Sequence, residues 1–265
     1  MPYIRALLRL FLLIIYTFIV VVSASTIINR FAPYKYHSIL LMSWYKFVTW
    51  LFGFKLEIIG KIPEFDKGRL IVANHSSYLD IMIIGGIIPC HFTPKGNIKK
   101  WPIIAQMVNS SQPIYVDREN KRSLTTQNKN VTDYILSGRN LVVFPEGTTN
   151  NTLEIKKFKS GGFSFLENNE NPKAKDIEIL PLTIIYSESG TEKFTGDNPS
   201  PIAWFGDATL LPHLWKLLKT KENKAIVTFH KPCKIIDFSS RKELALHIEN
   251  TIRNCMNEYI SRNKV

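Results

Sequence analysis

The sequence predicts an α/β domain with a mainly parallel mixed sheet flanked by helices, preceded by a helical unit that associates with a membrane. From residue 55 onward, short runs rich in branched and aromatic residues alternate with stretches of helical length, which is typical of a parallel sheet. Before that point, residues 10–28 carry no charged side chain, and about 20 such residues cross a bilayer. We therefore expect two units, residues 1–60 and residues 61–265.

Composition and charge indicate which classes of partner the chain can bind. Its 265 residues suffice for one large domain with a sizeable core. With 34 Lys+Arg against 22 Asp+Glu, the formal net charge of +12 favours polyanions such as anionic lipid. No nucleic-acid-binding motif is visible, so the sequence predicts a bilayer partner and no nucleic acid. The three cysteines lack metal-ligand spacing, and we expect neither a metal nor a redox cofactor.

The first element is an apolar helix over residues 10–28. Arg5 and Arg9 precede it, and Arg30 and Lys35 follow it, so the charges do not fix its orientation. A cleavable signal peptide is the alternative. The apolar block is long for a signal peptide and offers only a weak cleavage site, so a retained membrane helix is favoured.

The second element covers residues 37–60. Its amphipathic rings favour the headgroup zone of a bilayer: Trp44, Tyr45 and Trp50. Because Lys46 and Lys55 interrupt it, we expect it to lie on or dip into the bilayer. The alternative is a core helix that packs on the following domain.

The remaining elements build the sheet. Candidate strands cover residues 55–60, 69–74, 90–94, 112–117, 140–145, 177–186 and 225–231. Candidate helices cover residues 78–87, 98–109, 119–137, 158–169 and 240–261. The polar stretch 187–201 is expected to be a surface excursion. Open α/β sheets bind ligands beyond the carboxyl ends of their strands, so the residues that follow each strand are the candidate site.

The strand at residues 69–74 ends on His75, and Asp80 follows five residues later. In one continuous helix this step rotates about 500°, so the two side chains would not meet. They meet if His75 lies in the turn before a helix and Asp80 in its first turn. The alternative is purely structural, with Ser77 and Asp80 forming a capping box.

The chemical interpretation makes the pair a dyad. Asp80 would accept the Nδ1 proton of His75 and leave Nε2 as a base. No G-x-S-x-G nucleophile elbow occurs in the sequence. A dyad without a protein nucleophile suits direct deprotonation of a substrate hydroxyl.

Other polar residues follow other strands. Arg118 is a permanent cation whose planar fork suits phosphate. Gly147 allows close approach of the backbone to an anion, and the Thr148 hydroxyl can donate to it. The alternatives are an Asp117–Arg118 surface pair and an ordinary turn in which Glu146 caps a helix.

These residues resemble the ordered blocks of the glycerolipid acyltransferases, the family of 1-acylglycerol-3-phosphate acyltransferases. Asn74, His75 and Asp80 resemble its N-H-x-x-x-x-D motif. Three further blocks follow in order: Pro113–Arg118 (PIYVDR), Phe144–Thr148 (FPEGT) and Leu180–Leu182 (LPL). Residues 158–161 (FKSG) resemble the segment that often follows the third block. Order and spacing agree over about residues 55–200, which implies a glycerol-3-phosphate acyltransferase-like fold.

The resemblance also implies a reaction. His75, oriented by Asp80, would take the proton of the free hydroxyl of 1-acylglycerol-3-phosphate, and the oxygen would attack the thioester of acyl-CoA or acyl-acyl carrier protein, giving phosphatidate for phospholipid biosynthesis. No covalent acyl-enzyme and no cofactor would be needed. The implied substrate-binding residues are Asn74, Lys95, Arg118, Glu146, Gly147 and Thr148. We expect the inner (cytoplasmic) membrane, with the catalytic domain on the cytoplasmic side.

Two departures from the family pattern concern the acceptor. Thr149 and Asn150 replace the usual Arg-Ser of the third block, and Gln112 replaces a glycine of the second. A lysine at position 156, 157 or 159 could compensate for the lost cation. Residues 203–215 (AWFGDATLLPHLW) resemble relatives that acylate other lysolipids, including lyso-ornithine lipid, although their tryptophans would equally suit a core or a membrane face. The alternatives are therefore a different lysolipid acceptor and, more distantly, an inactive lipid-binding scaffold.

Overall fold

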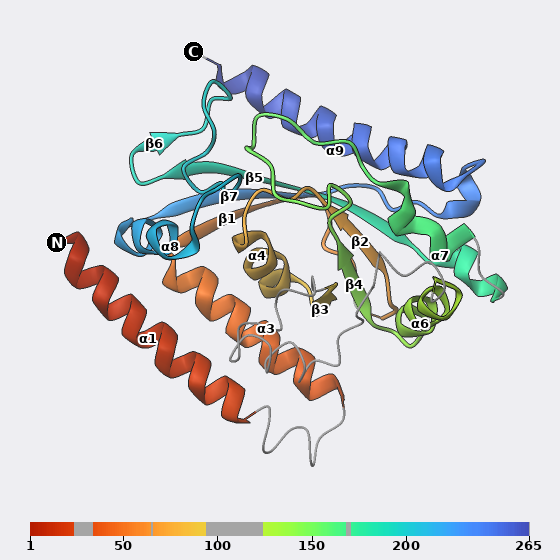
Figure 1. Ribbon diagram of the computed structural model, residues 1–265, viewed down its shortest axis with the longest axis horizontal. Coiled ribbons are helices and arrows are strands. Elements are labelled where there is room, and N and C mark those ends of the chain that lie inside the picture. Colours follow the sequence, from red (N-terminus) through yellow and green to blue (C-terminus); the bar gives the residue numbers. More distant parts are fainter. Residues whose placement is uncertain (24–33, 65, 94–123, 168–170, 265) are drawn as a thin grey trace.

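The computed structural model describes residues 1–23, 34–64, 66–93, 124–167 and 171–264 (Figure 1). Its centre is a seven-stranded sheet with the order β1-β7-β5-β2-β4-β3, and β6 pairs with β5. The strands are β1 (Phe54–Ile59), β2 (Leu70–Ala73), β3 (Cys90–Phe92), β4 (Asn140–Val143), β5 (Ile179–Ser189), β6 (Glu192–Lys193) and β7 (Asn223–Phe229). The predicted mixed sheet flanked by helices is confirmed.

Pairing is parallel for β1–β7, β2–β5, β2–β4 and β3–β4, and antiparallel for β5–β7 and β5–β6. In the centre, Val72 of β2 lies opposite Val143 of β4. The chain therefore leaves both strands at the same edge of the sheet, where His75 and Glu146 follow. β5 continues past the end of β2, which brings Tyr186 alongside this edge.

Helices cover both faces of the sheet (Figure 1). One core lies under α1 (Pro2–Ser23), α3 (Tyr34–Leu51), α4 (Leu79–Ile87) and α8 (Leu210–Lys219). The other lies under α6 (Leu124–Leu136), α7 (Ser164–Glu167) and α9 (Arg241–Asn263). Single 3₁₀ turns cover Ser160–Phe163, Pro172–Asp176 and Ile235–Asp237.

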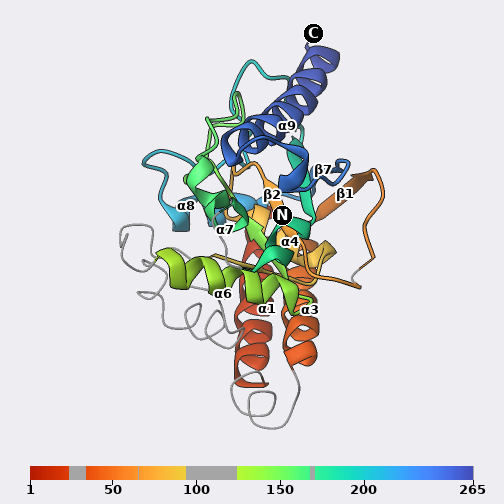
Figure 2. The ribbon, with the colours of Figure 1, turned by 90° about the vertical axis from the view of Figure 1, so that its right-hand side faces the viewer.

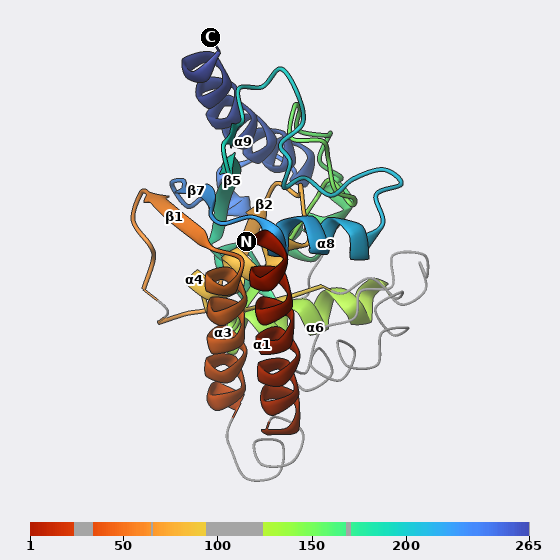
Figure 3. The same ribbon diagram turned by 90° about the vertical axis from the view of Figure 1, so that its left-hand side faces the viewer.

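The N-terminal helices α1 and α3 lie side by side as a hairpin (Figure 2, Figure 3). The Trp44 indole N–H donates to Thr17 Oγ1 at 2.9 Å and joins the two helices. Arg9 donates to the Thr220 carbonyl at 2.6 Å and fastens the start of α1 to the end of α8. Within the described residues, Pro2–Val20 is long and apolar enough to cross a membrane, and 11% of that span is buried. Helix α3 instead buries Leu41 and Val48 in the first core, so one of its faces packs as the core-helix alternative expects.

Several predicted elements differ from the structure. The described part of the helix predicted at 158–169 is a 3₁₀ turn followed by the single turn of α7, because Gly161 and Gly162 weaken a longer helix. The predicted excursion at 187–201 begins inside β5 and includes β6.

One helix was not predicted, and some predicted elements lie outside the described residues. Helix α8 was not foreseen, although Pro212 in its first turn is compatible with a helix start. The strand predicted at 112–117, the helix at 98–109 and the start of the helix at 119–137 lie outside the described residues. The unit boundary at residue 60 stays a prediction, although β1 on its N-terminal side pairs with β7.

Candidate active site

Residues 74–80, which we call the catalytic loop, run from the end of β2 into the first turn of α4. His75 Nδ1 lies 2.8 Å from Asp80 Oδ2, so the contact expected from the sequence is present. The His75 side chain keeps 18% of its surface exposed, whereas that of Asp80 keeps 1%. Substrate would therefore reach this pair from the histidine side. With Nδ1–H donated to the carboxylate, Nε2 is the nitrogen that can act as a base.

The Asp80 carboxylate accepts hydrogen bonds on both oxygens. Oδ2 accepts from His75 Nδ1, from Ser76 N at 2.7 Å and from Ser77 N at 3.0 Å. Oδ1 accepts from the Tyr186 hydroxyl at 2.5 Å. These hydrogen bonds hold the carboxylate in one orientation, which suits Asp80 to orient the His75 imidazole.

The capping-box alternative is partly realised. Helix α4 begins after Tyr78 rather than Ser77, and the N-cap side chain makes no capping hydrogen bond. Asp80 nevertheless binds the backbone N–H groups that precede the helix. The same carboxylate therefore caps the helix and contacts His75.

The imidazole plane is held by aromatic stacking. The His75 ring lies on Phe144, with ring centroids 4.1 Å apart and an interplanar angle of 13°. Phe92 stacks on Phe144 in turn, at 6.2 Å. The sequence identifies Phe144 as part of a block but not as the residue on which the histidine rests.

Glu146 and Asn74 position the catalytic loop. Oε1 of Glu146 accepts from His75 N at 2.7 Å, and Oε2 accepts from Asn150 Nδ2 and Lys156 N. Burial raises the pKa of Glu146, against these hydrogen bonds and the nearby His75. The Asn74 side chain exchanges two hydrogen bonds with the backbone of Ile184. Both side chains are almost fully buried, and the substrate contacts predicted for them stay predictions.

Asn150 is a positioning residue that the sequence did not reveal. Its backbone N–H donates to the His75 carbonyl at 2.8 Å. Its side-chain Oδ1 accepts from the Ser76 hydroxyl at 3.0 Å and from Thr152 N at 2.8 Å, and Nδ2 donates to Glu146. The only sequence signal was its position in the third block, where it replaces a serine.

The turn after Glu146 is open and basic. Gly147 has φ +75°, and a Cβ built on it would come within 2.8 Å of Lys159 Nζ. Thr148 is exposed, and Lys156 Nζ donates to the Thr149 carbonyl at 3.0 Å. We call residues 147–149, with Lys156 and Lys159, the lysine turn. Lys95 and Arg118 lie outside the described residues, so their roles stay predictions.

The segment 203–215 packs against the catalytic loop. Trp204 N donates to the Ser76 carbonyl at 2.8 Å. The Tyr78 ring meets the Trp204 ring edge-on at 5.7 Å, and its hydroxyl lies 3.2 Å from His213 Nδ1. This segment therefore forms one wall beside the dyad.

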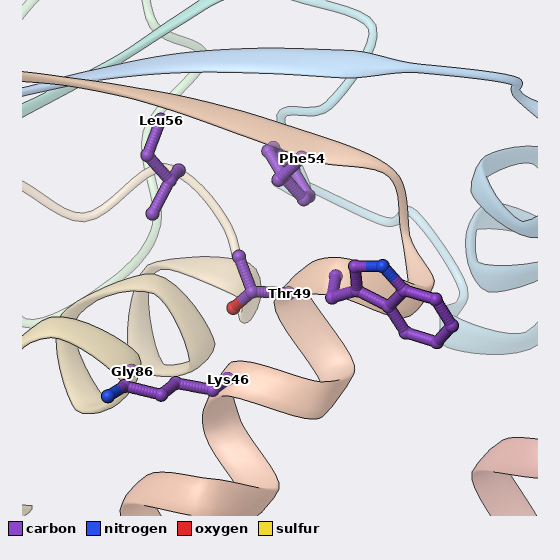
Figure 4. Close-up of a pocket in the computed structure, with 6 residues that line it drawn as sticks. Lys46, Thr49, Phe54, Leu56 and Gly86 are labelled. Carbon is purple, nitrogen blue, oxygen red and sulfur yellow. The ribbon is translucent and has the colours of Figure 1, made fainter.

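A cavity of about 290 Å³ opens between α3, α4 and β1 (Figure 4). The side chains around it are mainly apolar, and Lys46 extends toward Gly86 at one end. Its lining residues are Lys46, Thr49, Trp50, Phe54, Leu56 and Gly86. None of them is a residue of the dyad or of the lysine turn.

Comparisons with known proteins relate the chain to acyltransferases. The acyltransferase family model matches residues 54–185, which include the dyad and the lysine turn. The chain is 30% identical over 189 residues to a lyso-ornithine lipid O-acyltransferase of Rhodobacter capsulatus, covering 71% of this chain and 66% of that relative. It is 28% identical over 198 residues to a 1-acyl-sn-glycerol-3-phosphate acyltransferase of Neisseria gonorrhoeae, covering 75% and 73%.

The fold also matches a solved structure. The crystal structure of the 1-acyl-sn-glycerophosphate acyltransferase PlsC from Thermotoga maritima superposes with a TM-score of 0.60 and 22% identity, and the match covers 97% of both chains. This similarity extends over the N-terminal helices as well as the sheet.

Proposed function

The chain belongs to the acyltransferase family, and we propose that it transfers a fatty acyl group from acyl-CoA or acyl-acyl carrier protein to 1-acylglycerol-3-phosphate. The product would be phosphatidate. The observation that carries the proposal is the 2.8 Å contact between His75 Nδ1 and Asp80 Oδ2 at the end of β2. It leaves a partly exposed imidazole nitrogen as the base.

The dyad supports direct attack by the acceptor. His75 Nε2 takes the proton of the lysolipid hydroxyl while its oxygen forms a bond to the thioester carbonyl carbon. When the tetrahedral intermediate collapses, the C–S bond breaks and the imidazolium returns the proton to the leaving thiolate. Asp80 stabilises the imidazolium between these steps. No protein nucleophile takes part.

The lysine turn supports an acceptor with an anionic headgroup. Lys159 extends over Gly147, and Lys156 reaches the carbonyl of Thr149, the residue that replaces the usual arginine. Two ammonium groups beside the half-buried Gly147 suit a phosphate, which carries up to two negative charges. Thr148 and Arg118 are further proposed ligands of this group.

A second acceptor, lyso-ornithine lipid, is favoured by the segment 203–215. This segment packs on Ser76 and Tyr78 beside the dyad, so it can contact an acceptor. Relatives from Brucella abortus and Rhizobium meliloti with the lyso-ornithine name are 25% and 26% identical to this chain. Such an acceptor would present a carboxylate where lysophosphatidate presents a phosphate.

We further propose that the bilayer delivers the acceptor. Large apolar side chains of α1 are exposed: Tyr3, Ile4, Leu7, Leu8, Phe11, Ile14, Ile15, Phe18 and Ile19. Their burial in lipid would be favourable at about 25 cal/mol per Å². We place the protein at the cytoplasmic face of the inner membrane, where both acyl donors are made available.

Acyl transfer by the full chain in detergent tests the proposal. Labelled acyl-CoA and acyl-acyl carrier protein are offered with lysophosphatidate, lysophosphatidylcholine or lyso-ornithine lipid. We expect phosphatidate to form, and His75→Ala to lower kcat roughly 10²- to 10⁴-fold. His247→Ala, at an exposed position of α9, is the control.

Other outcomes would redirect the proposal. Transfer to lyso-ornithine lipid alone would assign the acceptor to the second candidate. No transfer from folded, vesicle-binding protein to any of the three would favour the inactive scaffold.

A further inference from the structure

We propose that Tyr186 is a positioning residue of the reaction, because its hydroxyl fixes the Asp80 carboxylate in the orientation that presents Oδ2 to His75. The inference rests on the proposed role of the dyad as the base. Tyr186 lies on β5, more than 100 residues after Asp80 in the chain, and its hydroxyl donates to Oδ1 at 2.5 Å.

The strand holds the tyrosine at this point. The antiparallel register of β5 against β7 shifts between Tyr186 and Glu188, and such irregularities re-aim side chains. The Tyr186 ring is buried in the first core, where its centroid lies 6.0 Å from that of Phe54. The hydroxyl therefore reaches Asp80 from the sheet and binds Oδ1, whereas the N–H donors of the catalytic loop bind Oδ2.

The two carboxylate oxygens have unequal partners. Oδ2 accepts from His75, Ser76 and Ser77, whereas Oδ1 accepts from the Tyr186 hydroxyl within the described residues. The Asp80 side chain is 1% exposed, so water does not readily replace a lost donor. A buried anionic oxygen without a donor is unfavourable. Without the hydroxyl, the carboxylate would rotate to share the remaining donors, and its bond to Nδ1 would loosen.

The hydroxyl remains a donor over the working pH range. Burial, the charge of Asp80 and the nearby Tyr78 together raise the pKa of Tyr186 well above its ordinary value. Among the described residues, Glu146 binds His75 N from the turn after β4, and His213 of α8 lies 3.2 Å from the Tyr78 hydroxyl. The Tyr186 hydroxyl therefore keeps its proton and can donate a hydrogen bond to Asp80.

The test removes one oxygen atom. Tyr186→Phe keeps the ring that fills the core, and Tyr259→Phe is the matched control because its hydroxyl donates to the Phe194 carbonyl in the other core. We expect Tyr186→Phe to lower kcat roughly 10- to 100-fold, the fold-change that corresponds to a hydrogen bond with a charged partner. The KM for the acceptor should not change, and Tyr259→Phe should keep kcat within about twofold.

A spectroscopic readout separates orientation from packing. The ¹⁵N shifts of the His75 ring, identified by their loss in His75→Ala, should show one protonated and one bare nitrogen in the native protein. In Tyr186→Phe we expect the two signals to move toward each other, because the proton is no longer held at Nδ1. Unchanged ring signals together with unchanged kcat would overturn the proposal.

A double-mutant cycle distinguishes a loss of Asp80 positioning from a general loss of stability in Tyr186→Phe. In the Asp80→Asn background, Tyr186→Phe should have little further effect on kcat or on the ring signals, because the carboxylate through which it acts is gone. An equal loss in both backgrounds would show a packing effect and would also overturn the proposal. The ring signals need no acceptor, so a failure of the proposed function, seen as absent acyl transfer by the native protein, is distinguishable from a failure of the Tyr186 role.

Discussion

The catalytic loop and the lysine turn lie at the same edge of the sheet, but they are built in opposite ways. In the catalytic loop, Asn74, His75 and Asp80 have their polar groups bound by the rest of the protein, from β5, from Glu146 and from Asn150. In the lysine turn, Thr148 is exposed and the ammonium groups of Lys156 and Lys159 sit on long side chains at the surface.

The difference follows from what each region has to do. Proton transfer needs atoms within hydrogen-bond reach in a fixed geometry, so the protein itself supplies the bonds that hold them. Headgroup binding needs charge, and mobile lysines can adjust to a ligand that arrives with its own charge. Substitutions in the catalytic loop should therefore change kcat or stability, and those in the lysine turn should change KM.

The largest expected effect concerns stability, because the fold contains a buried histidine that makes it sensitive to acid. His91 on β3 is buried, and burial together with nearby Arg139 lowers its pKa to about 4. The unfolded chain takes up this proton near pH 6.5 and the folded chain only near pH 4, so the free energy of unfolding falls as the pH drops between these values, by roughly 3 kcal/mol in all. His91→Gln should flatten this dependence, as measured by urea unfolding in detergent at pH 7 and pH 4.5.

The matched control for His91 is His247→Gln, an exposed histidine on α9. It should leave the pH dependence of unfolding as it is in the native chain. If His91→Gln instead retains the full loss of stability in acid, the acid-sensitive group lies elsewhere in the chain.

Much of the fold was predictable, because its strands are apolar runs bounded by turn residues. The runs at 69–74 and 140–145 became β2 and β4, within two residues at each end. The prediction from local sequence patterns failed at two helices. The glycines at 161 and 162 shortened a predicted helix, and α8 begins after Thr209, whose side chain makes no capping hydrogen bond.

The site was less predictable, because local spacing does not report tertiary partners. Spacing could suggest that His75 and Asp80 meet, since both belong to one strand–turn–helix unit. It could not show that Asn74 and Glu146 face inward, because that depends on β5 and on the segment around residue 156. Tyr186 lies within an apolar run that indicates only a strand, so nothing local marks its hydroxyl.

The next prediction concerns Asn150, which joins the two regions. Asn150→Ala removes the acceptor of Thr152 N and one donor to Glu146. Thr152 has φ +68°, a conformation that a β-branched residue rarely adopts. Without the hydrogen bond from Thr152 N to Asn150 Oδ1, the backbone at Thr152 would be free to leave this conformation. We expect a loss of about 2 kcal/mol in unfolding free energy and a lower kcat with little change in KM, measured by thermal unfolding and acyl transfer.

The control for Asn150 is its neighbour Asn151, whose side chain accepts a local bond from Leu153 N. Asn151→Ala should lower stability less and leave kcat near the native value. Equal effects of the two substitutions would mean that Asn150 acts through local turn structure. Asn150 would then not be the residue that couples the lysine turn to the catalytic loop.

The smallest expected effect isolates the lysine turn. Lys159→Ala removes the ammonium group that lies over Gly147, so the KM for a phosphate-bearing acceptor should rise about tenfold at low salt, with kcat unchanged. Lys157→Ala is the matched control, because Lys157 is exposed two residues away and should change KM less than about twofold. Raising the salt should narrow the difference in KM between the two variants, since exposed charges are screened.

If Lys159→Ala lowers kcat instead and leaves KM unchanged, Lys159 acts with the fixed residues of the catalytic loop. The charge of the headgroup would then be bound by residues outside the lysine turn, with Arg118 as the first candidate.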